Sequence, residues 1–302
     1  MLHQIYLIKK KRIMSKILIT GATGNLGSAV VNQLLKNTNA NKIVAFSRDE
    51  NNTTYLKENG IEFRLGTFED NASLDKAMVG IEKVLLISTT DPKRFYQHKN
   101  VVDAAKRAGV KFIAYTSVPI RDLDSAAAKT VLESHFQTED YIKESGLSYV
   151  FLRNNIYVDM VPMYVGEKVF ETGIYLPAGN GKVPFALRRE MGEATANLLL
   201  ESEQHQNKIY EITNTELYSF EDVARVLSEL SGKQITYTDA NIDEFTKMLI
   251  AHKMSAHIIP IFTAFVTDFK NHQYEKTSDE LKTLLGRKPS TLKEALKELY
   301  KL

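Results

Sequence analysis

The 302-residue chain contains no cysteine. It therefore has no disulfides, zinc thiolates or thiol nucleophile, which excludes several classes of enzyme and metal centre. It also lacks an excess of either charge, because 39 basic residues are balanced by 37 acidic ones and the net charge is +2. Nucleic-acid binders carry a strongly basic surface, so we expect no nucleic acid as a partner.

Long apolar runs are absent too. No stretch approaches the roughly 20 apolar residues that a membrane-spanning helix needs, so no membrane association is expected. The first residues, MLHQIYLIKKKRIM, place a short apolar run before a basic cluster. This order is the reverse of a secretory signal and favours the cytoplasm. We expect residues 1–13 to be a disordered tail or an upstream extension ahead of a domain that starts at Met14.

From Lys16 onward, short apolar runs alternate with stretches of helical spacing. The expected strands are KILIT, KIVAFS, IEFRLG, KVLLIS, KFIAYTS and SYVFLR, with helices between them, the last near residues 129–145. Parallel strands need such crossovers, which cover both faces of the sheet. The pattern predicts a doubly wound, parallel α/β sheet. Gly109 and Gly146 follow two of the helices and are expected to close their last turns in a left-handed conformation.

The regular alternation of strand and helix patterns ends near residue 155. We expect residues 14–155 to form the nucleotide-binding core. Residues 156–302 are expected to form a smaller, mostly helical domain that also returns at least one strand, KIYEIT, to the sheet. Such a domain would cover the carboxyl ends of the strands, where open parallel sheets bind their ligands.

The sharpest motif, GATGNLG at residues 21–27, lies directly between the first strand and the first helix. Gly21 permits a tight turn, Gly24 lets backbone amides approach a pyrophosphate, and Gly27 lets the helix pack closely on the strand. The helix N-terminus supplies unpaired amides to the phosphates. The alternative is an ordinary strand-to-helix turn. The motif favours a Rossmann-type dinucleotide site whose expected contacts are Gly21, Thr23, Gly24, Asn25, Leu26 and Gly27.

The end of the second strand indicates which dinucleotide is preferred. An acidic residue there would bind the ribose of NAD, but this chain has Ser47 and Arg48. A guanidinium grips a 2′-phosphate with two parallel hydrogen bonds, so NADPH is expected and NADH is less favoured. The alternative is that Arg48 is only a surface residue and that Asp49 binds the ribose.

Polar residues also end the later strands, and hydroxyls and amides at these positions suit ribose and carboxamide contacts. They equally serve as loop caps, which is the alternative for each. The residues expected to contact the cofactor are Ser88, Thr89, Thr116, Ser117 and Asn154.

Several segments together resemble one known family. GATGNLG, Arg48, VKFIAYTS, LRNN and EKTSDELKTLLG resemble the NmrA-like branch of the atypical short-chain dehydrogenase/reductases, from about residue 16 to the C-terminus. Within that branch the chain is most similar to the bacterial NAD(P)H:quinone oxidoreductases and triphenylmethane dye reductases. The resemblance implies an NADPH-dependent oxidoreductase. Some members of the branch instead bind the dinucleotide without turnover and act as redox-sensing regulators of a protein partner, which stays open as an alternative.

Two departures from the resembled pattern affect the site. Relatives have an acidic residue after the third strand, where this chain has Thr67 and Phe68, so we expect a changed adenine side of the pocket. The wider superfamily carries a Tyr-x-x-x-Lys pair after the fifth strand, at a spacing filled here by His135 and Glu139. The tyrosine protonates the alkoxide formed from a ketone. A reduced quinone, with a pKa of roughly 10, needs much less help, and a cationic dye needs none.

His135 is therefore the candidate catalytic residue, orienting a quinone or giving it a proton. The alternative is a helix-surface pair with Glu139. No metal is expected, because two ligands without a third do not make a site. The end of the sixth strand also places Asn155 in the expected substrate pocket, where Tyr157 and Phe185 are candidate aromatic walls for a flat acceptor, although such aromatic residues are more often core. The sequence does not determine the oligomeric state, and a homodimer is compatible with it.

Overall fold

The computed structural model describes residues 16–50 and 53–302. The expected tail at residues 1–13 lies outside the described residues. The chain forms two compact units that interleave along the sequence. The first contains residues up to 117, 135–152 and 192–209, and the second contains residues 118–134, 153–191 and 210–302. The predicted domain boundary near residue 155 stays a prediction.

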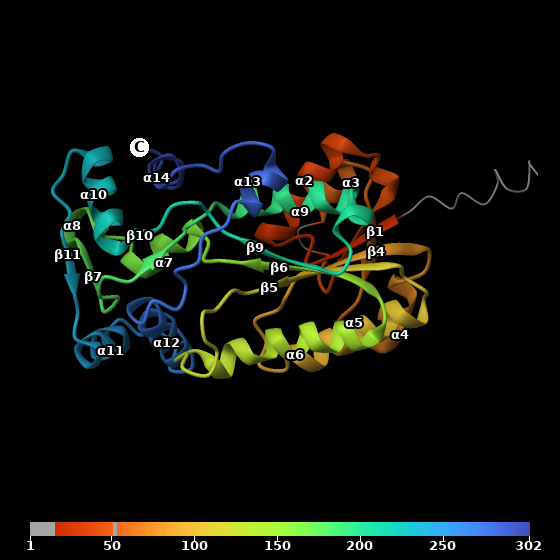
Figure 1. Cartoon of the computed structure of the whole chain (residues 1–302), viewed down its shortest axis with the longest axis horizontal. Coiled ribbons are helices and arrows are strands. Elements are labelled where there is room, and N and C mark those ends of the chain that lie inside the picture. Colours follow the sequence, from red (N-terminus) through yellow and green to blue (C-terminus); the bar gives the residue numbers. More distant parts are fainter. Residues whose placement is uncertain (1–15, 51–52) are drawn as a thin grey trace, which may run out of the picture. The chain divides into compact units, whose positions relative to one another are not determined.

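A seven-stranded sheet forms the centre of the first unit, and its last two strands continue into the second (Figure 1). The strands follow the order β3-β2-β1-β4-β5-β6-β9. Their bounds are β1 Lys16–Thr20, β2 Ile43–Ser47, β3 Glu62–Leu65, β4 Ile81–Leu86, β5 Phe112–Ser117, β6 Ser148–Asn154 and β9 Lys208–Ile212. The β1 strand pairs in parallel with β2 and β4, so that Leu18 lies between Val44 and Val84. The order reverses beside β1, where such sheets bind ligands at the carboxyl ends of the strands.

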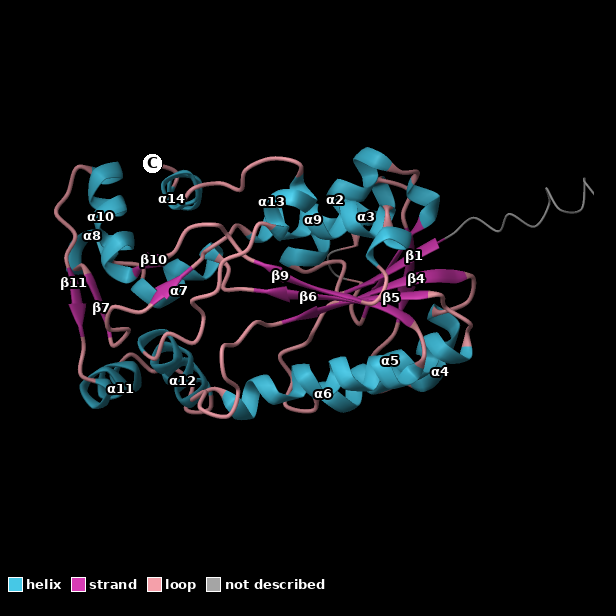
Figure 2. Ribbon diagram, in the orientation of Figure 1, coloured by secondary structure: helices cyan, strands magenta, loops and turns pink. Residues whose placement is uncertain are grey.

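Helices cover both faces of this sheet, with α2, α3 and α9 on one face and α4, α5 and α6 on the other (Figure 2). Their bounds are α2 Asn25–Asn37, α3 Thr54–Glu58, α4 Asn71–Ala77, α5 Arg94–Arg107, α6 Lys129–Ser145 and α9 Arg188–Leu200. A Cβ added to Gly192 would lie 2.6 Å from the Cβ of Ala29, so this glycine allows α9 to pack closely on α2. The expected doubly wound α/β sheet is therefore confirmed.

Two details of the helix boundaries are also confirmed. The helix expected near residues 129–145 is α6, Lys129–Ser145. Gly109 and Gly146 have φ angles of +72° and +78°, the left-handed conformation that glycine adopts without steric cost. The expected strand KIYEIT appears as β9. No described helix is both long and apolar enough to cross a membrane.

The second unit has its own core and two small sheets, which pair β10 with β8 and β11 with β7. Its elements are α7 Val161–Val165, α8 Val169–Thr172, β7 Ile174–Leu176, β8 Lys182–Val183, β10 Tyr218–Ser219, α10 Phe220–Ser231, β11 Tyr237–Asp239, α11 Ile242–Ala251, α12 Ile258–Lys270, α13 Glu280–Leu285 and α14 Leu292–Tyr300. Aromatic rings dominate its core, where Tyr164 contacts Phe220, Phe262 and Phe269. Such large rings supply much of the buried apolar area of a core.

Candidate functional site

The glycine loop between β1 and α2 is tightly constrained. Gly21 has a φ of +60°, and its carbonyl accepts a hydrogen bond of 2.9 Å from the Gly24 amide. A Cβ on Gly27 would lie 2.2 Å from the carbonyl oxygen of Gly21, so only glycine fits there. The Gly24 Cβ position is 3.3 Å from the same oxygen and needs only a small adjustment. Gly27 therefore serves the packing of the loop, whereas Gly24 leaves exposed backbone that a phosphate can approach.

The N-terminus of α2 completes this cradle. The helix begins at Asn25, and Gly24 at its N-cap provides no side-chain cap. The first amides of a helix lack intrahelical acceptors and carry a partial positive charge, so they suit an anion. Thr23, Gly24 and Asn25 are at least partly accessible, whereas Leu26 is buried. The residues present thus fit the pyrophosphate of a dinucleotide, although the individual contacts stay a prediction.

The end of β2 lies beside the glycine loop. The hydroxyl oxygens of Thr23 and Ser47 are 3.4 Å apart, and Ser47 Oγ also accepts the Asp49 amide at 3.4 Å. Arg48 is exposed and forms no ion pair with the residues that the structure describes. A guanidinium in this setting is available for a ligand phosphate.

The residues after β3 form an aromatic edge. The ring of Phe68 lies parallel to that of Phe46, with centroids 6.0 Å apart, and the Phe68 carbonyl accepts a hydrogen bond from Asn100. A Cβ on Gly66 would lie 2.8 Å from the Phe46 ring, so the chain passes close to it. Thr67 is exposed. A flat aromatic surface with an exposed hydroxyl beside it suits an adenine ring.

At the ends of β4 and β5, one predicted residue acts as a cap and another has no partner. The Thr116 hydroxyl accepts the Ser88 amide at 2.9 Å, which is the loop-capping alternative. Ser117 Oγ is buried and has no hydrogen-bond partner among the described residues. Buried polar atoms are normally satisfied, so this orphan oxygen suits a ligand contact.

His135 and Glu139 are both buried, with exposed fractions of 5% and 1%. The surface-pair alternative is therefore wrong. The cause is the packing of α6 on the sheet, which turns this helix face inward. His135 Nδ1 lies 2.9 Å from the hydroxyl of Tyr115 on β5. Burial, together with the charge of Arg94 and the neighbouring His98, holds the pKa of His135 well below its usual value. A histidine with this pKa is neutral near pH 7 and is a poor source of an imidazolium proton.

Sequence reasoning missed the polar cluster around His135. Arg94 and His98 of α5 and Thr138 of α6 are buried beside Tyr115. Desolvation, reinforced by Arg94, lowers the pKa of His98 to about 3. Burial raises the pKa of Tyr115, so its hydroxyl keeps its hydrogen. Arg94 and His98 are four residues apart and, with Gln97, form the polar start of a buried stripe of α5 that is apolar from Val101 onward. Polar residues at core positions of an amphipathic helix were the signal that could have revealed them.

The remaining candidates lie in the second unit. Phe185 is 1% exposed and its ring packs on Phe220, so its assignment as a pocket wall is wrong and it belongs to the core. Asn155 is also buried; its side-chain amide donates to the Tyr274 carbonyl and accepts from the Ile156 amide, and its substrate contact stays a prediction.

Asn154 and Tyr157 keep features of a ligand site. Asn154 Nδ2 donates to the Tyr157 hydroxyl at 3.2 Å, whereas Asn154 Oδ1 is buried with no partner among the described residues. Tyr157 is partly exposed, and the guanidinium of Arg188 lies 4.6 Å from its ring centroid. Both residues stay predictions.

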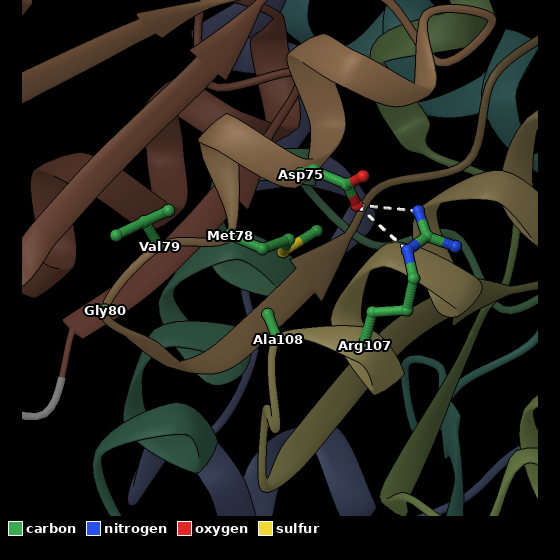
Figure 3. Close-up of a pocket in the computed structure, with 6 residues that line it drawn as sticks. All are labelled: Asp75, Met78, Val79, Gly80, Arg107 and Ala108. Carbon is green, nitrogen blue, oxygen red and sulfur yellow. Dashed lines mark hydrogen bonds and ion pairs between the residues drawn. The ribbon is translucent and has the colours of Figure 1, made fainter.

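A surface depression of about 420 Å³ lies away from these residues, at the amino ends of β4 and β5 (Figure 3). It is lined by Asp75, Met78, Val79, Gly80, Arg107 and Ala108. Its charged groups are paired with each other, since Arg107 donates to Asp75 at 2.7 Å. Ligands of parallel sheets bind at the opposite, carboxyl ends, so we assign this depression no role. Residues 16–50 and 53–302 contain no cluster of His, Asp and Glu that could hold a metal ion.

Comparison with known proteins agrees with this geometry. Quinone oxidoreductase 2 of Escherichia coli (strain K12) is 33% identical over 286 residues, which cover 94% of this chain and 98% of that protein. A crystal structure of the E. coli NADPH-dependent quinone oxidoreductase with NADPH covers 94% of this chain and 99% of its own, with a TM-score of 0.85 and 33% identity. The NADP(H) complex of Citrobacter sp. triphenylmethane reductase covers 94% and 100%, with a TM-score of 0.87 and 34% identity. The model of the NmrA-like family matches residues 14–296, and the chain therefore belongs to the NmrA-like family.

Proposed function

We propose that this chain is an NADPH-dependent oxidoreductase that reduces quinones or quinone-like and dye acceptors, acting in the cytoplasm. The observation that carries the proposal is the glycine cradle with Arg48 next to it at the end of β2. Gly21, Gly24 and the first amides of α2 bind the pyrophosphate. Arg48 binds the 2′-phosphate that distinguishes NADPH from NADH. The relatives named for quinone, dye and NADPH chemistry match nearly the whole chain, which supports the same reaction class.

Bound NADPH would supply the hydride, and the protein supplies binding, orientation and the exclusion of water. Phe68 and Thr67 border the adenine ring, and Ser117 Oγ offers an unpaired contact within the same unit. His135 is neutral and cannot act as a strong acid. This limits the acceptor to one whose reduced form needs little protonation, as a quinone or a cationic dye does.

The test is the loss of nicotinamide absorbance with purified protein, NADPH or NADH, and a panel of benzoquinones, naphthoquinones and a triphenylmethane dye. NADPH-selective turnover is expected. In the same assay Arg48→Ala is expected to lose this selectivity. Arg107→Ala is its matched control, because it removes a guanidinium of the first unit that is paired with Asp75 at the other end of the strands. Tight NADPH binding without turnover on any acceptor would contradict the proposal and favour the redox-sensing regulator.

A further inference from the structure

A chain of hydrogen bonds runs through the buried cluster and has a fixed direction. It starts at the loop after β4, where the Thr89 backbone amide lies 3.3 Å from His98 Nε2. A backbone amide only donates, so Nε2 must accept. The neutral ring of His98 therefore carries its hydrogen on Nδ1, which lies 3.1 Å from Thr138 Oγ1. Thr138 thus accepts from His98.

The same reasoning assigns donor and acceptor for the bonds that connect Thr138 to His135. The Thr138 hydroxyl also bonds the phenolic oxygen of Tyr115. This bond lowers the pKa of Tyr115, which identifies the Thr138 hydroxyl as the donor and the phenolic oxygen as the acceptor. Tyr115 consequently directs its hydrogen to His135 Nδ1, 2.9 Å away. With Nδ1 occupied as an acceptor, the neutral ring of His135 carries its hydrogen on Nε2.

His135 Nε2 is the end of this chain. It has no hydrogen bond to any described residue and is not among the fully buried atoms that lack a partner, so it retains access to the surface. The charged and titratable groups that act on the ring are Arg94 and His98 from α5 and Tyr115 from β5, whereas Glu139 from α6 acts on Tyr115. The positive guanidinium of Arg94 opposes formation of an imidazolium.

We propose that His98, Thr138 and Tyr115 are positioning residues that hold His135 as its Nε2–H tautomer, so that the ring donates a hydrogen bond to the oxygen of a quinone acceptor. The inference rests on the proposed quinone reduction. The bond orients and polarises the acceptor oxygen, and the proton that completes the reduced product comes from solvent. A triphenylmethane dye without an oxygen substituent receives hydride at carbon and does not use this bond.

The first test is the ¹⁵N NMR spectrum of histidine-labelled protein, assigned by comparison with His135→Gln. At neutral pH, Nε2 of His135 is expected to be protonated and Nδ1 to be unprotonated. Tyr115→Phe should shift the Nδ1 resonance and populate the other tautomer. Tyr141→Phe is the matched control, because the Tyr141 hydroxyl donates to Asp103 and takes no part in the hydrogen bonds that lead to His135. A wild-type ring protonated on Nδ1, or a resonance unchanged in Tyr115→Phe, would overturn the proposal.

The second test compares two acceptors in each variant. Tyr115→Phe and Thr138→Val are expected to lower kcat/KM with a quinone about tenfold, the equivalent of one good hydrogen bond. Dye reduction should change less than about twofold. Thr138→Ser, which keeps the hydroxyl, should restore quinone reduction, and His135→Gln, which keeps an N–H donor, should retain more of it than His135→Ala. Equal losses with both acceptors would show a merely structural role and reject the proposal.

The two proposals fail separately. If the wild-type protein reduces no acceptor, the proposed function is wrong, whereas the NMR spectrum still decides the tautomer. If Tyr115→Phe does not fold, Thr138→Val breaks the same chain one bond earlier and gives the same readout.

Discussion

The hydroxyl oxygens of Thr23 and Ser47 lie 3.4 Å apart and connect the glycine loop to the end of β2. This contact places Arg48, the next residue, beside the helix terminus that would hold a pyrophosphate. The glycine loop, proposed to hold the pyrophosphate, and Arg48, proposed to hold the 2′-phosphate, are thus joined within one unit.

Arg48→Ala is expected to remove the preference for NADPH. In the proposed function the guanidinium bonds the 2′-phosphate, so its loss should raise KM for NADPH about tenfold or more and leave KM for NADH nearly unchanged. The measurement is kcat/KM with each dinucleotide and one quinone. An unchanged ratio would instead support the alternative in which Asp49 binds the ribose.

Gly24→Ala should separate binding from stability. The position has a φ of −81°, which alanine adopts freely, and its Cβ would lie 3.3 Å from the Gly21 carbonyl. We expect the melting temperature to fall by only a few degrees. The added methyl group should block the phosphate and raise Kd for NADPH about tenfold or more, measured by calorimetry.

Gly27→Ala is the contrasting variant, because its Cβ would lie 2.2 Å from backbone. It should destabilise the fold itself, by about 1–3 kcal/mol. NADPH binding as tight in Gly24→Ala as in the wild type would show that the loop is an ordinary strand-to-helix turn.

Acid should destabilise the protein through its buried histidines. The folded-state pKa of His98 is about 3, below the ordinary value of 6.5, and that of His135 is lowered too. Between these values the unfolded state binds more protons than the folded state, so the free energy of unfolding rises with pH. The contribution of these two histidines to the free energy of unfolding is therefore fully present above about pH 6.5 and is lost as the pH falls toward 3.

The measurement is urea denaturation at several pH values between 5 and 7, above the ordinary pKa range of carboxyl groups. Each buried histidine should contribute a slope of about 1 kcal/mol per pH unit near pH 5.5. His98→Gln, which keeps an acceptor for the Thr89 amide, should reduce that slope. A slope equal to that of the wild type would mean that His98 takes up its proton without unfolding.

The sequence by itself determined the features that depend on neighbouring residues. The glycines at 21, 24 and 27, the alternation of strands and helices, the α6 range and the left-handed turns at Gly109 and Gly146 follow from local backbone preferences. These preferences act over a few neighbouring residues and can therefore be predicted from the sequence. The fold class follows from them, because parallel strands require crossovers, whereas the strand order β3-β2-β1-β4-β5-β6-β9 is known only from the structure.

The tertiary structure alone decided which polar residues are buried and what they contact. From the sequence, His135 is either a catalytic residue or half of a helix-surface pair with Glu139. Only the structure shows that both side chains are buried and that His135 lies against Tyr115. The sequence also suggested Phe185 as a pocket wall, whereas the structure buries its side chain in the core of the second unit. Burial depends on what packs against a side chain, and those partners are distant in sequence. The pKa of His135, its tautomer and the residues that hold it follow from that packing and from no local pattern.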